Sequence, residues 1–179
     1  NQYYNKQRAR LQSLLPGNRK TSRRIDRLTD KRNRKINHYL HVASRRIVEL
    51  LVQQDVGALI VGKNDGWKQK AGMGRRTNQN FISVPHARFL HLLEYKLQLS
   101  GIVCQFTKEN HTSKCSFLDL EPVEHREHYV GKRVRRGLFR SSNGTAINAD
   151  LNGAYNMIRK VIPEAFRQGI EGVVVHPMP

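Results

Sequence analysis

A helical periodicity that runs from about Thr21 to Gln54 constrains this chain more than any other feature of its sequence. Apolar side chains recur there every three or four residues, the spacing that gathers them on one face of an α-helix. These apolar positions are Ile25, Leu28, Ile36, Tyr39, Leu40, Ala43, Ile47, Leu50 and Leu51. A shorter helix over residues 1–15 ends at Pro16-Gly17, because this dipeptide favours a turn. We therefore expect two antiparallel helices at the start of the chain.

The positions between these apolar residues are mostly basic. Residues 1–50 hold 14 Lys and Arg against 3 acidic residues, a net +11 of the chain's formal +18. A solvated helix face usually mixes both signs, so a face of one sign favours contact with the phosphates of a nucleic acid. A solvated basic face is the alternative. The residues of this segment that we expect to contact nucleic acid are Arg23, Arg24, Arg27, Arg34 and Lys35.

The pattern changes at Gly57, where Ala58–Val61 forms a short continuous apolar run typical of a buried strand. Pro85 suits the first turn of a helix that stops at Gly101, and residues 102–107 alternate like a second strand. This order of strand, helix and strand predicts an α/β unit with a parallel pair. In the polar, glycine-rich loop after the first strand, a tryptophan is as often packed as stacked on a base. The expected nucleic-acid contacts there are Lys63, Trp67, Lys68, Arg75 and Arg76.

Residues 108–146 are irregular apart from Tyr129–Arg140, whose alternation favours a basic hairpin. A helix begins at Asn148 and ends at Pro163, and a short last strand is expected over Gly172–Val175. The apolar side of this helix is Leu151, Ala154, Tyr155 and Ile158. The basic residues of the hairpin that we expect to contact nucleic acid are Lys132, Arg133, Arg135 and Arg136.

Two of the few carboxylates stand at the ends of predicted elements. Glu109 follows the strand 102–107, and Asp150 lies in the first turn of the helix that begins at Asn148. Carboxylates so placed suit a two-metal phosphodiester site, where Mg²⁺ ions activate water and stabilise the leaving oxygen. The alternatives are that Glu109 is an ordinary loop acid and that Asp150 only complements the helix dipole.

A zinc site has weaker support. His111, Cys115, His125 and His128 have spacings that can bind zinc, but no pair of cysteines two residues apart occurs. Solvated loop histidines are the alternative. Two cysteines cannot build a disulfide framework, so a reducing compartment is expected. The sequence has neither an apolar run long enough to span a membrane nor an apolar N-terminal signal segment.

Five segments of the sequence resemble, in the same order and over nearly the whole chain, the TnpB family of transposon-encoded transposases, also called OrfB. They are Leu59–Gln69, Asn78–Phe81, Glu109–Lys114, Gly131–Arg133 and Asn148–Asn156. The most specific parts are Thr-Ser-Lys, which ends Glu109–Lys114, and the segment Asn-Ala-Asp-Leu-Asn-Gly-Ala-Tyr-Asn over Asn148–Asn156. The resemblance implies an RNase H-like RuvC nuclease that cuts DNA with a guide RNA and Mg²⁺, related to the type V CRISPR effector nucleases.

The resemblance also assigns residues. Asp150 matches the last RuvC acid. The second acid is usually a Glu at the end of the strand 59–61, where this chain has Gly62; some branches resemble this one and carry the Glu just before the Thr-Ser motif, at Glu109. The first acid, an Asp on a strand, is expected in an upstream part of the same protein. We expect Glu109 and Asp150 to bind Mg²⁺ together, with carboxylates within about 8 Å of each other.

The resemblance also implies a four-cysteine zinc ribbon between the Thr-Ser motif and Asp150, and this chain is expected to keep only a remnant of it. Cys115 alone remains, and Arg140-Ser141-Ser142-Asn143 stands where a cysteine pair is expected, so no zinc is predicted.

The expected fold is therefore α/β, an RNase H-like (RuvC) nuclease fold that is incomplete at its N-terminus. Its parts are a basic helical segment (1–56), an α/β core (57–109), an insertion that replaces the zinc ribbon (110–146), and a C-terminal helix and tail (147–179). The expected function is that of the C-terminal part of a transposon-associated, RNA-guided, Mg²⁺-dependent DNA endonuclease. We expect it in a prokaryotic cytoplasm, near the nucleoid, with guide RNA and target DNA as partners and no membrane. A relative that binds nucleic acid without cutting it is the main alternative, and a generic basic RNA-binding protein is a weaker one.

Overall fold

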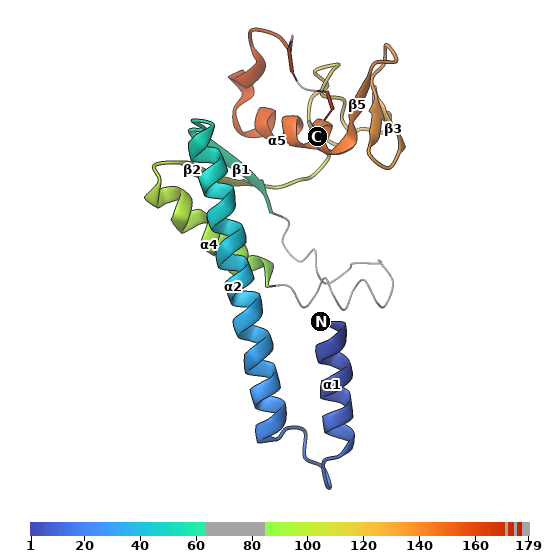
Figure 1. Ribbon diagram of the computed structural model, residues 1–179. Helices are drawn as coiled ribbons and strands as arrows, with labels where there is room; N and C mark the ends of the chain where they lie inside the picture. The colour runs from blue at the N-terminus through green and yellow to red at the C-terminus, as the bar shows by residue number, and fades with distance from the viewer. Residues whose placement is uncertain (64–84, 171, 174, 177–179) are drawn as a thin grey trace. The chain divides into compact units, whose positions relative to one another are not determined.

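The computed structural model of the protein describes residues 1–63, 85–170, 172–173 and 175–176 (Figure 1). The chain divides into two compact units, Asn1–Ala58 with Gly66–Val103 and Leu59–Asp65 with Cys104–Pro179. The predicted contacts at Trp67, Lys68, Arg75 and Arg76 lie outside the described residues. None of the described helices is both long and apolar enough to cross a membrane.

Helices α1 (Gln2–Ser13) and α2 (Arg23–Gln53) form an antiparallel pair in the first unit (Figure 1). The Tyr4 and Thr29 hydroxyls lie 3.0 Å apart, and Arg32 Nη2 donates to Asn1 Oδ1 over 3.0 Å, so the start of α1 lies beside the first third of α2. Ser22 caps α2, because its hydroxyl accepts from the Ile25 N–H. The two predicted helices are confirmed.

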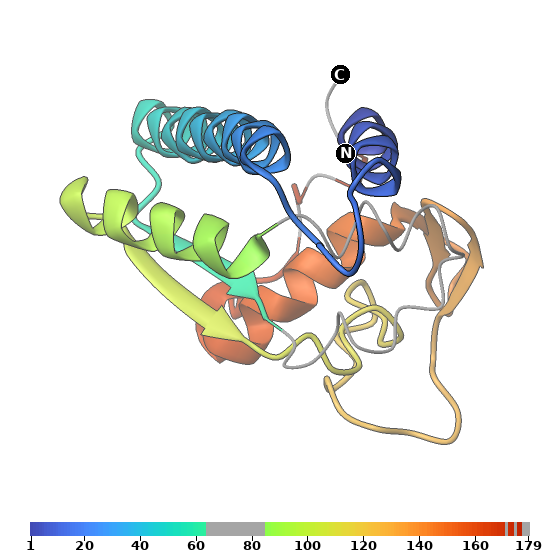
Figure 2. The same ribbon diagram turned by 90° about the horizontal axis from the view of Figure 1, so that it is seen from below.

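Helix α4 (His86–Leu99) packs on α2 (Figure 2). Lys96 donates to the His41 carbonyl over 2.7 Å and to the buried Ser44 hydroxyl over 2.8 Å. Burial, with a smaller contribution from Arg45, lowers the pKa of Lys96. The buried apolar side chains of these two helices are Ile25, Leu40, Val48, Leu92, Leu93 and Leu97.

Strands β1 (Ala58–Gly62) and β2 (Val103–Thr107) form a two-stranded sheet. The Val103 N–H donates to the Gly57 carbonyl over 3.0 Å, and the Lys63 N–H donates to the Thr107 carbonyl over 2.8 Å. These bonds advance in the same direction along both strands, which makes the pair parallel and places Gly62 opposite Thr107. The predicted parallel unit of strand, helix and strand is confirmed, and the carboxyl ends of both strands meet at one edge.

A second, antiparallel sheet has the order β3-β4-β5, with β3 (Lys132–Arg135), β4 (Leu138–Arg140) and β5 (Ala146–Asn148). Lys132 pairs with Arg140 across β3 and β4, and Phe139 pairs with Ile147 across β4 and β5. The predicted basic hairpin is therefore confirmed. Strand β5 was not predicted, because three residues are too few to show an alternation.

Helix α5 (Ala149–Val161) follows β5 directly, and the short helix η1 (Pro163–Phe166) follows α5. Asn148 caps α5, because its side-chain oxygen accepts from the N–H groups of Asp150 (2.9 Å) and Leu151 (3.2 Å). The predicted helix and both of its ends are confirmed.

The core of the second unit forms around the ring of Phe117. This ring stacks on Tyr155 at 4.5 Å and meets Phe166 edge-on at 4.9 Å. The predicted last strand is wrong for the described residues of 172–175, none of which lies in a strand. Val173 and Val175 instead pack against this core, and the Val175 carbonyl accepts from the N–H of Asn148, the last residue of β5, over 2.7 Å. Packing on the core accounts for their apolar character.

Candidate functional site

The side chain of Glu109 occupies the space beside Gly62. A Cβ atom built on Gly62 would lie 2.5 Å from Glu109 Cγ and 2.7 Å from its Cδ, and closer still to Oε1. Real Cβ atoms do not approach other atoms so closely, so Glu109 stands where a side chain from Gly62 would project. Both residues lie at the carboxyl edge of the parallel pair, the edge at which open α/β sheets bind ligands.

The backbone that carries Glu109 is held from two directions. Thr112 Oγ1 donates to the Glu109 carbonyl over 2.8 Å, and Asn156 Nδ2 donates to the Thr112 carbonyl over 3.0 Å. Lys160 Nζ donates to the Lys108 carbonyl over 2.9 Å. The segment after β2 is thus bonded to α5, the helix that carries the second candidate acid.

Asp150 is exposed in the first turn of α5, where a carboxylate is favoured by the helix dipole. Asn156, which is bonded to the Glu109 segment, lies six residues later, or about 9 Å farther along the helix axis. The expected separation of the two carboxylates, within about 8 Å, stays a prediction.

The donor chemistry of this pair fits Mg²⁺. Among the described residues, no three His, Cys, Asp or Glu side chains come together as a metal-binding group. Mg²⁺ does not need such a cage, because it usually takes one or two protein carboxylates and completes its shell with water and substrate phosphates. Glu109 and Asp150 can supply those carboxylates.

Two fully buried asparagines of α5 support this region, and the sequence analysis missed them. Asn152 accepts from the Phe117 N–H over 2.9 Å and donates to the Cys115 carbonyl over 2.9 Å, while Asn156 donates to the carbonyls of Thr112 and Cys115. The signal that could have found them is their spacing of four, which puts two amides on one helix face.

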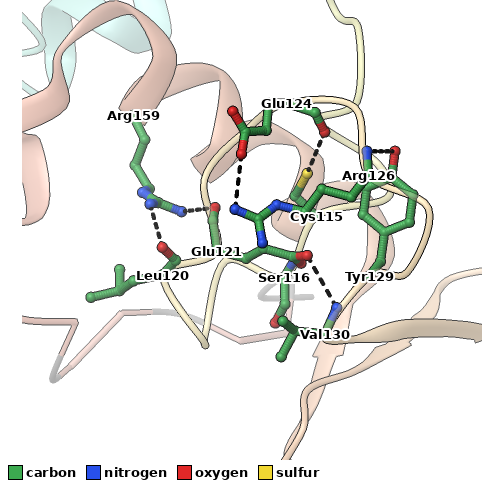
Figure 3. A network of polar contacts seen from close by, with 9 residues as sticks. All are labelled: Cys115, Ser116, Leu120, Glu121, Glu124, Arg126, Tyr129, Val130 and Arg159. Atoms are coloured by element: carbon green, nitrogen blue, oxygen red, sulfur yellow. Dashed lines mark hydrogen bonds and ion pairs between the residues drawn. The ribbon is translucent and has the colours of Figure 1, made fainter.

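Cys115, the single cysteine of the expected zinc ribbon, is buried in a network of polar contacts (Figure 3). Its Sγ lies 3.7 Å from the Glu124 carbonyl, and burial raises the pKa of the thiol. The buried Glu121 carboxylate accepts from the N–H groups of Ser116 (2.7 Å) and Val130 (3.1 Å) (Figure 3). Backbone donors thus satisfy a charge that would otherwise be costly to bury.

The candidate zinc ligands do not converge. The rings of His111 and His125 lie 5.5 Å apart edge to face, but they form no three-membered metal-binding group with Cys115 or His128 among the described residues. Tyr129 lies 3.3 Å from His111 Nδ1 instead.

A carboxylate joins the turn after Cys115 to the turn at Ser142, the two places where the family resemblance leads us to expect zinc-ribbon cysteines. Asp119 Oδ2 accepts from the Ser142 N–H over 3.0 Å, and Oδ1 accepts from the Ser142 hydroxyl. Burial alone would raise the pKa of Asp119, but hydrogen bonding by Ser116 and Ser142 outweighs it and lowers that pKa. The turn after Cys115 and the turn at Ser142 are therefore linked by the hydrogen bonds of one carboxylate.

The basic residues predicted on α2 are exposed. At 100° per residue, Arg23, Arg27 and Arg34 fall within about 40° of one another around the helix. The ion pairs found among the described residues of α2 join Arg45 and Arg46 to Glu49, at the other end of the helix. The exposed basic positions of the helix are Arg23, Arg24, Arg27, Arg34 and Lys35.

The basic hairpin presents a second positive surface. Strand β3 lies at the edge of its sheet and all four of its residues are exposed. Lys132 faces Arg140 across the strands, and such like-charged pairs destabilise a sheet unless an anion lies close by. Lys63, at the end of β1, is exposed with its ammonium 5.6 Å from the Phe106 ring centre. The exposed basic positions of the hairpin that were predicted to bind nucleic acid are Lys132, Arg133, Arg135 and Arg136.

Known proteins resemble this chain in sequence over most of its length. Residues 1–68 match a family described as probable transposase, OrfB of IS605, and residues 86–157 match the Cas12f1-like TNB domain. The TnpB-like protein ORF457 of Acidianus two-tailed virus is 25% identical over 172 residues, which cover 89% of this chain and 34% of that protein. The chain belongs to the TnpB family. It spans about a third of the length of this viral relative.

A solved structure shows the same fold. The Cas12f1 chain in a Cas12f1–sgRNA–target DNA complex superposes with a TM-score of 0.57 at 23% identity, over 87% of this TnpB-family chain and 40% of that chain. Together with the parallel pair and the helices of each unit, this likeness shows an α/β fold of the TnpB and Cas12 type.

Proposed function

We propose that this TnpB-family chain forms part of an RNA-guided DNA endonuclease with an RNase H-like RuvC site. The observation that carries the proposal is the Glu109 side chain in the space of the missing side chain at Gly62. The family resemblance puts an acid at the end of β1, and Glu109 supplies a carboxylate there from the turn that follows β2.

In this proposal Glu109 and Asp150 hold Mg²⁺, which when bound activates water and stabilises the leaving oxygen of a phosphodiester. The carboxylates bring negative charge to a strongly basic chain, so the cation has a defined place among groups that otherwise attract phosphate. The first RuvC acid, an Asp, is expected from an upstream part of the same protein.

The expected partners are a guide RNA and target DNA. The Cas12f1 relative in fold is named as a complex with sgRNA and target DNA. The exposed arginines of α2 and of the β3–β4 hairpin supply phosphate contacts of the kind that bind a backbone without reading its sequence. A prokaryotic cytoplasm, close to the nucleoid, is the proposed location.

The proposal is tested by single-turnover cleavage with the whole protein, expressed together with the RNA encoded beside it. Asp150→Ala and Glu109→Ala should each lower the cleavage rate about a hundredfold or more, because a metal supplies several kcal/mol to the transition state. Both variants should bind DNA as the wild type does. Glu127→Ala, which removes an exposed acid of the insertion, is the matched control and should cut normally.

If the wild-type protein binds guide RNA and target DNA but cuts in no buffer with Mg²⁺ or Mn²⁺, this proposal is wrong. The alternative of a binding protein without nuclease activity then replaces it. Normal cutting by Asp150→Ala would remove the RuvC assignment altogether.

A further inference from the structure

Glu109 is the first residue of a strained turn. The Thr112 N–H donates to the Glu109 carbonyl over 3.3 Å, which closes a turn over residues 109–112. His111, the third residue of this turn, has a φ of 66°, a left-handed conformation that favours glycine or asparagine. Non-glycine residues keep such a backbone only where their surroundings over-determine it.

Those surroundings come mainly from α5. Asn156 donates to the Thr112 carbonyl, and Thr112, which is 4% exposed, donates its hydroxyl to the Glu109 carbonyl. Lys160, one helical turn beyond Asn156, holds the carbonyl of Lys108 on the other side of Glu109. The backbone of Glu109 is therefore bonded on both flanks to side chains that α5 orients.

We propose that Thr112, Asn156 and Lys160 are positioning residues that hold the Glu109 carboxylate over Gly62 in the geometry that binds a divalent cation. This inference rests on the proposed function. It assigns a role to the Thr-Ser turn and to the last asparagine of the Ala-Asp-Leu-Asn-Gly-Ala-Tyr-Asn segment, neither of which contributes a metal ligand.

The test uses Mn²⁺ as the probe and the whole chain, without nucleic acid. Paramagnetic Mn²⁺ broadens nearby NMR signals, so the Mn²⁺ concentration that halves the Gly62 amide signal reports binding at Glu109. Thr112→Val keeps the shape of the buried side chain but loses the hydroxyl donor, whereas Thr112→Ser keeps the donor. We expect Thr112→Val to need about fivefold more Mn²⁺, the size of one net hydrogen bond, and Thr112→Ser to behave like the wild type.

The variant Glu109→Ala distinguishes a failure of the proposed metal site from a failure of the proposed positioning role. If Glu109→Ala leaves the broadening of Gly62 unchanged, the metal assignment of the proposed function fails. If Glu109→Ala abolishes it but Thr112→Val matches the wild type, or Thr112→Ser weakens it as much as Thr112→Val, the positioning role is wrong.

Lys160 provides the same comparison at an exposed position. Lys160→Met removes the donor to Lys108, and Lys160→Arg keeps a donor there. A weaker Mn²⁺ response in Lys160→Met alone supports the proposal, and equal responses in both contradict it. This pair decides the matter if the spectrum of Thr112→Val shows an unfolded chain.

Discussion

Leu120 adopts a backbone conformation that is energetically unfavourable for a leucine. Its φ is 49°, in the left-handed region that a leucine rarely adopts, and its side chain is 45% exposed. Its carbonyl accepts from Arg159 Nη2 over 2.8 Å, so the conformation serves a contact made by the backbone and not by the side chain. A residue without a Cβ can make the same contact without the strain.

Leu120→Gly should therefore raise the free energy of unfolding by about 1 kcal/mol, since it relieves left-handed strain and loses little burial. Leu120→Ala keeps the strain and serves as the control, with a change near zero. Chemical denaturation at neutral pH measures both. A Gly variant that is less stable than the Ala variant would show that the leucine side chain, and not the backbone, matters here.

Asp119 makes stability depend on pH in a defined direction. Because its pKa is lowered in the folded chain, its contribution is complete above the usual carboxyl pKa of about 4 and is lost as the pH falls through the lowered value. Asp119→Asn should cost about 1–2 kcal/mol at pH 7 and progressively less toward pH 3. Denaturation of both proteins across this range measures the difference, and a constant difference would contradict the role given to the charge.

At the scale of elements, hydrogen bonds join the turns of residues 110–146, the segment in which a remnant of a zinc ribbon is expected. Asp119 and Ser142 join the two turns, and Glu121 binds the backbone of Ser116 and Val130. Purified protein should therefore contain no stoichiometric zinc, and a chelator should leave its thermal unfolding unchanged. Elemental analysis and melting curves test this, and one zinc per chain would return His111, Cys115, His125 and His128 as ligands.

Helix α2 should act as an electrostatic element. Arg23→Glu with Arg27→Glu should weaken nucleic-acid binding and lower the slope of log affinity against log salt by about 1 per lost phosphate contact. Arg45→Glu with Arg46→Glu changes the net charge equally, at two exposed positions already paired with Glu49, and should have a smaller effect. The extended charge reversal, which adds Arg34→Glu and Lys35→Glu, should weaken binding further.

Filter binding across a salt series measures these slopes. Equal effects of the two double variants would mean that only net charge matters and that the predicted face on α2 is wrong.

At the scale of the whole molecule, the sequence predicted the elements whose patterns are local. The apolar periodicity of α2 and the run Ala58–Val61 gave a helix and a strand of nearly the observed length, because burial of one face repeats with the period of the backbone. The strand expected over Gly172–Val175 is not formed by the described residues of that range. Val173 and Val175 are apolar because they pack on the core, and the backbone bond from Asn148 to Val175 does not extend into a strand there.

The candidate site was only partly predictable. Residue types at element ends pointed to Glu109 and Asp150, but only the family resemblance linked Glu109 to Gly62. The bond from Asn156 to the Thr112 carbonyl spans 44 residues. The spacing of Asn152 and Asn156 puts both amides on one helix face, but it does not indicate which backbone groups they bond. Such tertiary hydrogen bonds become visible only when the fold brings their partners together.

The central claim, that Glu109 replaces the acid missing at Gly62, is tested most directly by moving the carboxylate back. Gly62 does not have the left-handed backbone that would exclude a side chain, and Glu109→Ala removes the atoms that a Cβ at Gly62 would meet. In single-turnover cleavage by the whole protein with its RNA, Glu109→Ala should be inactive, and adding Gly62→Glu should restore cutting to within about tenfold of the wild type. The combination of Glu109→Ala with Gly62→Gln should stay inactive, because an amide does not replace a charged metal ligand. Wild-type cutting by Glu109→Ala, or equal rescue by Gly62→Gln, would contradict the claim.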